Sequence, residues 1–340
     1  MSMTQNFEET RISANFEGMK AEYIKLIENA PKTDFSKIDE KSPFLPGFYV
    51  IGALPSVGKT AVCLNLSANI CKNGVPVLYI SYEESQFVMA SKDLARYWFL
   101  ENYEKFRSGA DGTPSASSIR RVDEKFKNYQ EEHGAEYFSI LPQWQKAREN
   151  FYFVRGTNEP ASKLIEMIKK YVKEKGVKFV VIDYLQIISP EQEEIKKNLP
   201  LRERIDVAVT KLREMQEETG ITLLLISMLN RENYNQYASM ESFKETGRIE
   251  YSADVLFVLQ MKFDEGETRT KKATQDKFVE YPRTLELVCV KNRYGERYSA
   301  ELEFFTRHDT FAKVGDIKIP KENRKTADNQ QQENDDYDHE

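Results

Sequence analysis

The sequence predicts an α/β fold, with a central, mostly parallel β-sheet covered by helices and an antiparallel extension at the C-terminal end. Apolar segments of strand length alternate with helical segments between residues 48 and 227, as in parallel strands buried on both faces. Three further strand-like segments follow one another without helices, which favours antiparallel neighbours. A phosphate-loop motif lies between the first predicted strand and the helix after it, the position that such a loop requires.

The chain begins with a helical lead over residues 1–33, which is too short to form a domain. Its apolar side chains recur at helical spacing and are Phe16, Met19, Tyr23, Leu26 and Ile27. We expect this lead to pack on the chain's own core, with packing on a neighbouring subunit as the alternative.

The folded domain is expected to span residues 34–318. Its strands are predicted at residues 48–53, 75–83, 151–156, 178–183, 221–227, 254–261, 284–290 and 298–305. Helices are predicted after the second strand and at residues 59–73, 160–176 and 201–220. Residues 101–150 are expected to form an irregular helical section, and residues 263–277 a charged loop. The tail, residues 319–340, is acidic and has almost nothing to bury, so we expect it to be disordered.

The composition excludes several classes of protein. The chain has 340 residues, of which 40% are hydrophobic, enough for one large core. Its net charge of -6 gives no general support for binding nucleic acids, which would need a local basic patch. The three cysteines form no C-x-x-C pair, and three histidines do not complete a zinc site. No signal peptide or membrane-spanning segment is evident, so we expect a cytoplasmic protein with no membrane partner.

The phosphate-loop motif is the segment GALPSVGKT, residues 52–60. It differs from G-x-x-x-x-G-K-[ST] by an alanine at the first position. In this context backbone N–H groups and the helix N-terminus bind phosphate oxygens, the lysine reaches the β- and γ-phosphates, and the threonine hydroxyl is a Mg²⁺ ligand. The candidate ATP-binding residues are Ala53, Pro55, Ser56, Val57, Gly58, Lys59 and Thr60.

Acidic side chains follow two other predicted strands. Glu83 and Glu84 come at the end of one, and Asp183 ends another. The first pair could supply a carboxylate that orients the attacking water, and Asp183 the aspartate that holds Mg²⁺. Exposed acids and a turn-forming aspartate are the alternatives for each alone. All three features in this order favour an ATPase.

Two cations, Lys291 and Arg293, are two residues apart on the predicted strand that precedes Gly295. Residues at this spacing lie on one face of a strand, so both side chains could contact a phosphate. By spacing alone, a solvated basic surface is the simpler interpretation.

Six segments resemble the C-terminal ATPase domain of replicative DnaB-type helicases, which have a RecA-like P-loop fold. They are A-x-P-S-x-G-K-T at 53–60, S-x-E at 81–83, IDYLQ at 182–186, S-x-L-N-R at 227–231, K-E-x-G-x-I-E at 244–250 and K-x-R-x-G at 291–295. The resemblance covers residues 35–314, and residues 101–150 match poorly. The alanine of the loop and its proline two residues later are the DnaB-type form of the motif.

The resemblance implies ATP and Mg²⁺ as cofactors and gives roles to the candidates. Lys59 binds phosphate, and the Mg²⁺ site uses Thr60 and Asp183. Glu83, not Glu84, matches the catalytic glutamate of the family.

The resemblance also implies a partner subunit, which changes the interpretation of the two cations. Lys291 and Arg293 match cations that reach the ATP of the adjacent subunit, where they stabilise charge on the transferred phosphoryl group. This requires a homo-oligomer, a ring of six in the family. Lys244, Glu245 and Gly247 match the loop that follows single-stranded DNA through the ring.

The sequence departs from the family at three points. Met228 stands where the family has a glutamine, and a thioether is a poor partner for a γ-phosphate. Lys244 replaces the usual arginine, which keeps the charge but loses the fork geometry. The short helical lead stands in place of a globular N-terminal domain that binds primase.

The predicted function is therefore an ATP-hydrolysing, DnaB-like ring motor that translocates on single-stranded DNA as a helicase in DNA replication, with a possible replication partner protein. One alternative is a RecA-like ATPase that acts as a switch, loader or scaffold without unwinding DNA. The other is a non-catalytic nucleotide-binding module, against which the retained Glu83, Asp183 and Arg293 argue.

Overall fold

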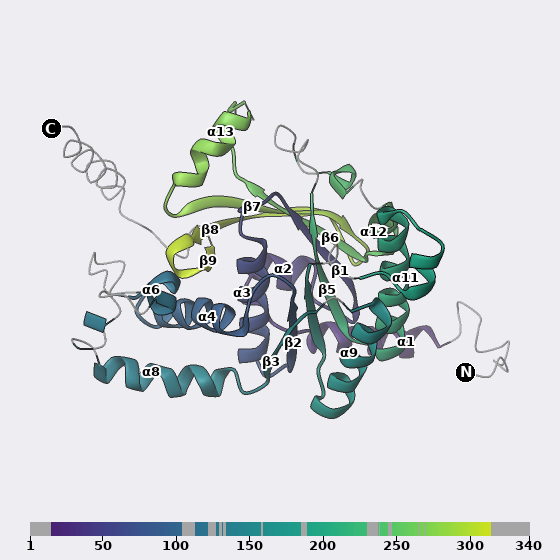
Figure 1. The fold of residues 1–340 in the computed structure, drawn as a ribbon, viewed down its shortest axis with the longest axis horizontal. Coiled ribbons are helices and arrows are strands. Elements are labelled where there is room, and N and C mark those ends of the chain that lie inside the picture. The colour runs from purple at the N-terminus through teal and green to yellow at the C-terminus, as the bar shows by residue number, and fades with distance from the viewer. Residues whose placement is uncertain are drawn as a thin grey trace.

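The computed structural model describes residues 15–103, 113–121, 127–128, 131, 134–157, 159–184, 189–229, 237, 239–243, 247–264, 266–268 and 270–313. In this part of the chain nine strands form one sheet, in the order β3-β2-β4-β5-β1-β6-β7-β8-β9 (Figure 1). The strands are β1 (Gly47–Ala53), β2 (Val77–Ser81), β3 (Phe151–Arg155), β4 (Phe179–Asp183), β5 (Thr222–Met228), β6 (Val255–Met261), β7 (Arg283–Asn292), β8 (Tyr298–Phe305) and β9 (Thr310–Lys313).

The sheet has the predicted mixture of parallel and antiparallel strands. β1 to β6 pair in parallel, while β7, β8 and β9 extend the sheet beyond β6 in antiparallel pairs. Every residue of β1, β2, β4 and β6 is buried, as expected for strands covered on both faces. The prediction of a mostly parallel α/β sheet with an antiparallel C-terminal extension is confirmed.

Helices cover both faces of this sheet. α3 (Lys59–Lys72) and α4 (Gln86–Glu101) lie on one side, and α9 (Ala161–Lys175) and α11 (Leu201–Thr219) lie on the other (Figure 1). The remaining described α-helices are α1 (Phe16–Glu28), α2 (Ser36–Lys41), α6 (Ala116–Arg121), α8 (Gly134–Ala147), α10 (Gln192–Lys196), α12 (Gly247–Ser252) and α13 (Lys271–Asp276). In the described part of the chain, no helix combines the length and apolar character needed to cross a membrane.

Two segments differ from the sequence-based expectation. The charged segment 263–277 contains α13, which begins after Thr270, whose hydroxyl accepts a hydrogen bond from the Ala273 N–H at 3.0 Å. This N-cap favours the start of a helix, but the many charged residues around it led to the prediction of a loop. β9 was not predicted because its four residues are too short for a periodic pattern. The expected tail, residues 319–340, lies outside the described residues.

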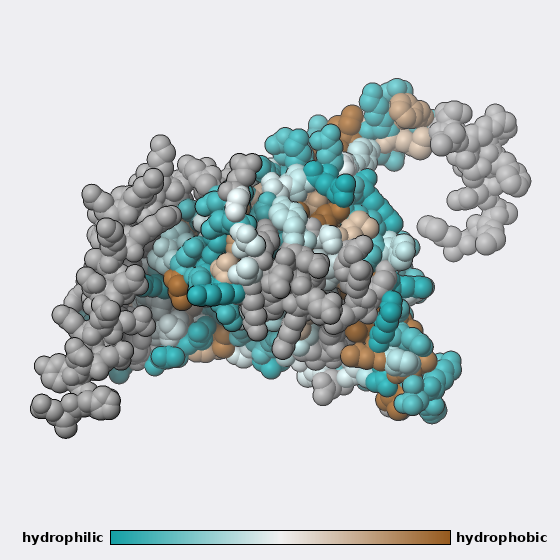
Figure 2. Space-filling view, turned by 90° about the horizontal axis from the view of Figure 1, so that it is seen from above, coloured by the Kyte–Doolittle hydropathy of each residue, from teal (hydrophilic) through white to brown (hydrophobic). Residues whose placement is uncertain are grey.

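The helical lead has its apolar side chains on the surface. α1 buries no residue, and Phe16 is 61% exposed. In Figure 2, α1 projects from the body of the molecule at the upper right, with brown hydrophobic surface among teal. The helix therefore offers an apolar face that the described part of its own chain does not cover.

Candidate functional site

The candidate ATP site lies where the parallel strands end. Ala53, the last residue of β1, is beside Met228 of β5, and Ser81 of β2 is beside Asp183 of β4. The phosphate loop follows β1, Glu83 follows β2 and Asp183 ends β4, so these residues lie at the carboxyl ends of parallel strands, which is where ligands bind in open α/β folds. Met228 therefore lies next to the start of the phosphate loop, so the family's glutamine position is at the site.

The phosphate loop turns into α3 through two residues with positive φ. Ser56 has φ 63°, and Gly58, the N-cap of α3, has φ 117°. A Cβ at Gly58 would also lie 3.0 Å from the Phe304 ring, so conformation and space both require glycine there. Ala53 has no positive φ and ends a regular strand. An alanine at the first motif position therefore costs the loop nothing.

Two side chains donate hydrogen bonds to the carboxylate of Asp183, which is 1% exposed. Thr60 Oγ1 donates to Asp183 Oδ2 at 2.9 Å, and the Tyr79 hydroxyl donates to the same oxygen at 3.0 Å. Mg²⁺ is commonly held by one or two protein oxygens together with substrate phosphates. The adjacent hydroxyl and carboxylate of Thr60 and Asp183, just past the phosphate loop, fit that requirement.

The charged groups of the site shift one another's pKa values. Burial lowers the pKa of Lys59, and the negative charges of Asp183 and Glu83 oppose that shift. Burial also raises the pKa of Asp183; the hydrogen bonds from Thr60 and Tyr79 lower it, while Glu83 raises it further. Glu83 thus lies within electrostatic reach of both the phosphate-loop lysine and the Mg²⁺-site aspartate.

The two neighbouring glutamates have different surroundings. Glu84 forms an ion pair with Lys92 of α4, with 2.8 Å between Oε1 and Nζ, and its N–H donates to Ser81 Oγ. Glu83 interacts instead with the charges of Lys59 and Asp183. Of the two glutamates, Glu83 is therefore the one whose charge acts on both the phosphate-loop lysine and Asp183.

Lys291 and Arg293 lie at the opposite end of the strands from the phosphate loop, close to the start of β6. Asn292, between them, is paired with Val255, which is beside Tyr49 near the start of β1. Lys291 Nζ donates to the Glu250 carbonyl at 2.7 Å. Burial lowers the pKa of Lys291, as does the charge of Arg293.

That end of the strands is remote from the phosphate loop of the same chain. Ala53 is beside Leu259 of β6, and the strand from Val255 to Leu259 covers about 13 Å. The two cations thus lie far from their own loop, and both bind the segment just before β6.

Of the predicted DNA-binding residues, Lys244 and Glu245 lie outside the described residues, and Gly247 is the first residue of α12. Three contacts of the candidate residues were not predicted. Tyr79 holds Asp183, Arg283 Nη1 donates to the Ser56 carbonyl at 3.2 Å, and Asp254 binds Arg293. A lone acid before an apolar strand was the available signal for Asp254.

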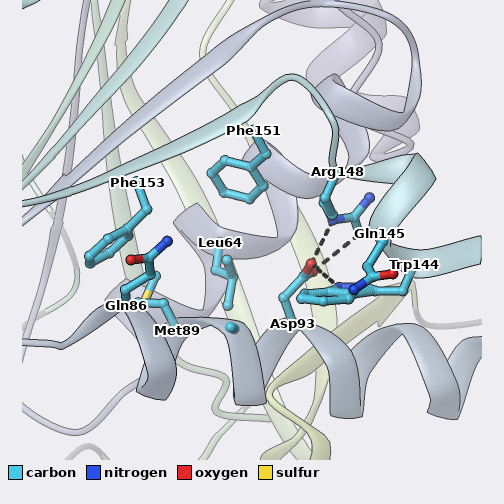
Figure 3. Close-up of a pocket in the computed structure, with 10 residues that line it drawn as sticks. Leu64, Gln86, Met89, Asp93, Trp144, Gln145, Arg148, Phe151 and Phe153 are labelled. Carbon is cyan, nitrogen blue, oxygen red and sulfur yellow. Dashed lines mark hydrogen bonds and ion pairs between the residues drawn. The ribbon is translucent and has the colours of Figure 1, made fainter. Parts of the chain in front are cut away.

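A separate pocket of about 240 Å³ opens beside α4, away from these residues. Figure 3 shows the Asp93 carboxylate at one end of it, joined to Arg148 and Trp144 by dashed lines. Arg148 Nε donates to Asp93 Oδ2 at 2.5 Å and Trp144 Nε1 at 2.7 Å. Through this buried cluster, the C-terminal end of α8 packs on α4.

The family model described as "DnaB-like helicase C terminal domain" matches residues 32–313. The chain belongs to this family. A match over that span includes the phosphate loop, both acidic strand ends and the two cations.

Several named relatives of this DnaB-like chain are helicases. It is 25% identical over 288 residues to a "Probable plasmid replicative DNA helicase" of Chlamydia trachomatis, covering 83% of this chain and 54% of that protein. It is 24% identical to "Replicative DNA helicase DnaB" of Treponema pallidum, covering 76% and 50%. The DnaB-like chain thus spans about half the length of the curated relatives it matches.

Solved structures share the fold of this DnaB-like chain. One, whose title describes it as an ATPase domain, matches with a TM-score of 0.68 and 19% identity, covering 87% of this chain and 97% of that one. A second match, titled "The Structure Of A DnaB-Like Replicative Helicase And Its Interactions With Primase", has a TM-score of 0.65 and 18% identity, covering 87% and 66%. Both matches support a RecA-like fold for this chain.

Proposed function

We propose that this DnaB-like chain is an ATP-hydrolysing ring motor that translocates on single-stranded DNA as a helicase in DNA replication. The observation that carries the proposal is the division of the site between the two ends of the strands in one sheet. Lys59, Glu83 and Asp183 gather at the carboxyl ends of the strands, whereas Lys291 and Arg293 lie at the other end. A neighbouring copy that presents its second end to the first end of this chain would complete the site.

Each group has a chemical task in such a shared site. Lys59 and the N–H groups of the loop bind the phosphates. Thr60 and Asp183 would hold Mg²⁺, which neutralises phosphate charge when bound. Glu83 orients the attacking water and accepts its proton. Arg293 and Lys291 of the neighbour stabilise the charge that develops on the transferred phosphoryl group.

The proposal also covers the ring that the subunits form and the DNA strand that it surrounds. Six copies would surround one DNA strand, with Lys244, Glu245 and Gly247 following its backbone. The helicases among the relatives support a motor over a loader or switch. The solved helicase whose title reports interactions with primase supports a replication protein as a partner.

Strand displacement on a forked DNA substrate tests this function. We expect ATP-dependent unwinding, ATP hydrolysis that single-stranded DNA stimulates, and loss of both in Lys59→Ala, which removes the charge that reaches the phosphates. A purified protein with strong ATP hydrolysis but neither DNA binding nor DNA stimulation would refute the helicase function.

A further inference from the structure

The side chain of Arg293 is already held in the isolated subunit. Its Nη1 donates to Asp254 Oδ1 at 2.8 Å, and its Nη2 donates to the Tyr251 carbonyl at 3.0 Å. The Arg293 side chain is nonetheless 49% exposed. The guanidinium is therefore fixed on one side while part of it remains open to a neighbouring molecule.

Asp254, which binds one side of the Arg293 guanidinium, is itself held in place by several hydrogen bonds. Its N–H donates to the Phe48 carbonyl at 2.7 Å, and its carbonyl accepts from the Arg293 N–H at 3.0 Å. Its Oδ2 accepts from the Phe48 N–H at 2.8 Å. A Cβ at Gly47 would lie 3.0 Å from that oxygen, so the start of β1 closes around the carboxylate. Asp254 is 5% exposed and has little freedom to move.

A second arginine shares the carboxylate. Arg213 Nη1 of α11 donates to Asp254 Oδ2 at 2.5 Å, and Arg213 Nε donates to Glu217 at 2.7 Å. Burial lowers the pKa of Arg213, but its bonds to Asp254 and Glu217 outweigh burial and leave that pKa raised. One buried carboxylate thus faces two guanidinium groups. Asp254 therefore orients Arg293 while sharing its negative charge with Arg213.

We infer that Asp254 is a positioning residue that orients the Arg293 guanidinium for the ATP bound by the adjacent subunit, an inference that rests on the proposed shared site. An arginine side chain loses about 2 kcal/mol of conformational entropy when it is immobilised. Asp254 fixes Arg293 before the neighbour's ATP arrives, so the reaction does not bear that cost. A misplacement of about 1 Å at a catalytic group can lower the rate about 100-fold.

Asp254→Asn is the direct test, because asparagine keeps the volume and one oxygen but loses the charge. We expect kcat to fall by roughly 10- to 100-fold and KM for ATP to stay within about 3-fold, because the subunit's own phosphate loop dominates ATP binding. Asp254→Glu, which keeps the charge but displaces the carboxylate, should also lower kcat; it decides the question if the asparagine variant fails to fold. An unchanged kcat in a folded variant overturns the inference.

Mixed rings separate positioning from a structural role. An Asp254→Asn subunit keeps an intact phosphate loop, and a Lys59→Ala subunit keeps Asp254 and Arg293. Their mixture should therefore hydrolyse ATP faster than the two separate proteins together. Asp254→Asn mixed with the double variant Asp254→Asn/Lys59→Ala contains no complete site and should show no gain.

Arg293→Ala mixed with Lys59→Ala is the control for the shared site. If this pair gains activity while the Asp254→Asn pair does not, Asp254 does not act through the neighbour's site and the inference is wrong. If the Arg293→Ala pair also fails to gain activity, the shared site itself is refuted, and the inference falls with it.

Discussion

Glu83 and Glu84 are adjacent in the chain but differ in their partners. Glu84 is paired with Lys92, whereas the charge of Glu83 acts on Lys59 and Asp183. The sequence alone offered both acids at the end of one strand, and only the family resemblance separated them. The pairing of Glu84 now gives a physical reason for the choice.

Exchange of each glutamate for glutamine tests that reason. Glu83→Gln should lower kcat for ATP hydrolysis by about 10²- to 10⁴-fold, the usual contribution of a general base. Glu84→Gln is the matched control and should keep activity within about 3-fold, since a partly exposed ion pair contributes only ~1 kcal/mol to stability. Steady-state hydrolysis measured on both proteins decides the assignment, and the opposite ranking would exclude Glu83.

The motif residues could be predicted because they are close together in sequence or follow a strand. Asp254 could not be, because its contact with Arg293 depends on β6 lying between β1 and β7. Tyr79 was missed for a related reason. Within the apolar strand VLYIS it has the pattern of a core residue, and the hydroxyl's partner, Asp183, lies on another strand.

α8 is fastened to α4 through a buried ion pair. The side chains of Asp93 and Arg148 are 4% and 7% exposed. Burial alone would raise the pKa of Asp93, but the charge and hydrogen bonds of Arg148 hold that pKa below its ordinary value of 3.8. Asp93 therefore stabilises the fold above about pH 3.8, and this stabilisation is lost as the pH falls through the lower folded-state pKa.

Asp93→Asn should lower the free energy of unfolding by about 3–5 kcal/mol at pH 7, because it leaves a buried guanidinium without its counter-charge. The difference from the wild type should shrink as the pH falls below about 3.8. Chemical denaturation of both proteins between about pH 3 and pH 7 measures this. A difference that stays constant across the range would show that the Asp93 charge does not stabilise the fold.

α1 contributes nothing to the core of its own subunit. Because its apolar residues are exposed, we propose that they pack on a neighbouring copy. Exchange of Tyr23 and Leu26 for glutamate should then weaken assembly by at least about 10-fold, since each buried apolar side chain contributes about 1.5–3 kcal/mol. Thermal unfolding of the isolated subunit should be unchanged. Sedimentation measures the assembly, with Glu22→Ala as the control, and undiminished assembly of the double variant would refute the packing role.

The regular elements could be predicted wherever apolar periodicity was strong. β1 was expected at residues 48–53 and α11 at residues 201–220; they occupy Gly47–Ala53 and Leu201–Thr219. The section 101–150 gave weaker signals. Only an irregular helical section was expected there, without helix boundaries, whereas α8 occupies Gly134–Ala147 and contains Pro142. Packing on α4 through Asp93, which no local pattern reveals, holds this helix in place.

In the proposed ring motor, each molecule presents two incomplete halves of one site, at opposite ends of its central strands. The phosphate loop, Glu83 and Asp183 form one half, and Lys291 with Arg293 forms the other. A subunit with this arrangement can complete its site only in an assembly where each copy faces the next. Head-to-tail contacts of this kind close into a ring when the rotation between copies allows it.

The mass of the assembly with an ATP analogue and single-stranded DNA tests this account most directly. Six copies of the 39.6 kDa chain on one strand should give a species of about 240 kDa plus the DNA, as a closed head-to-tail ring requires. Arg293→Ala should weaken the dependence of that species on the nucleotide. If the protein remained a monomer with both ligands present and still hydrolysed ATP, this result would contradict the shared site.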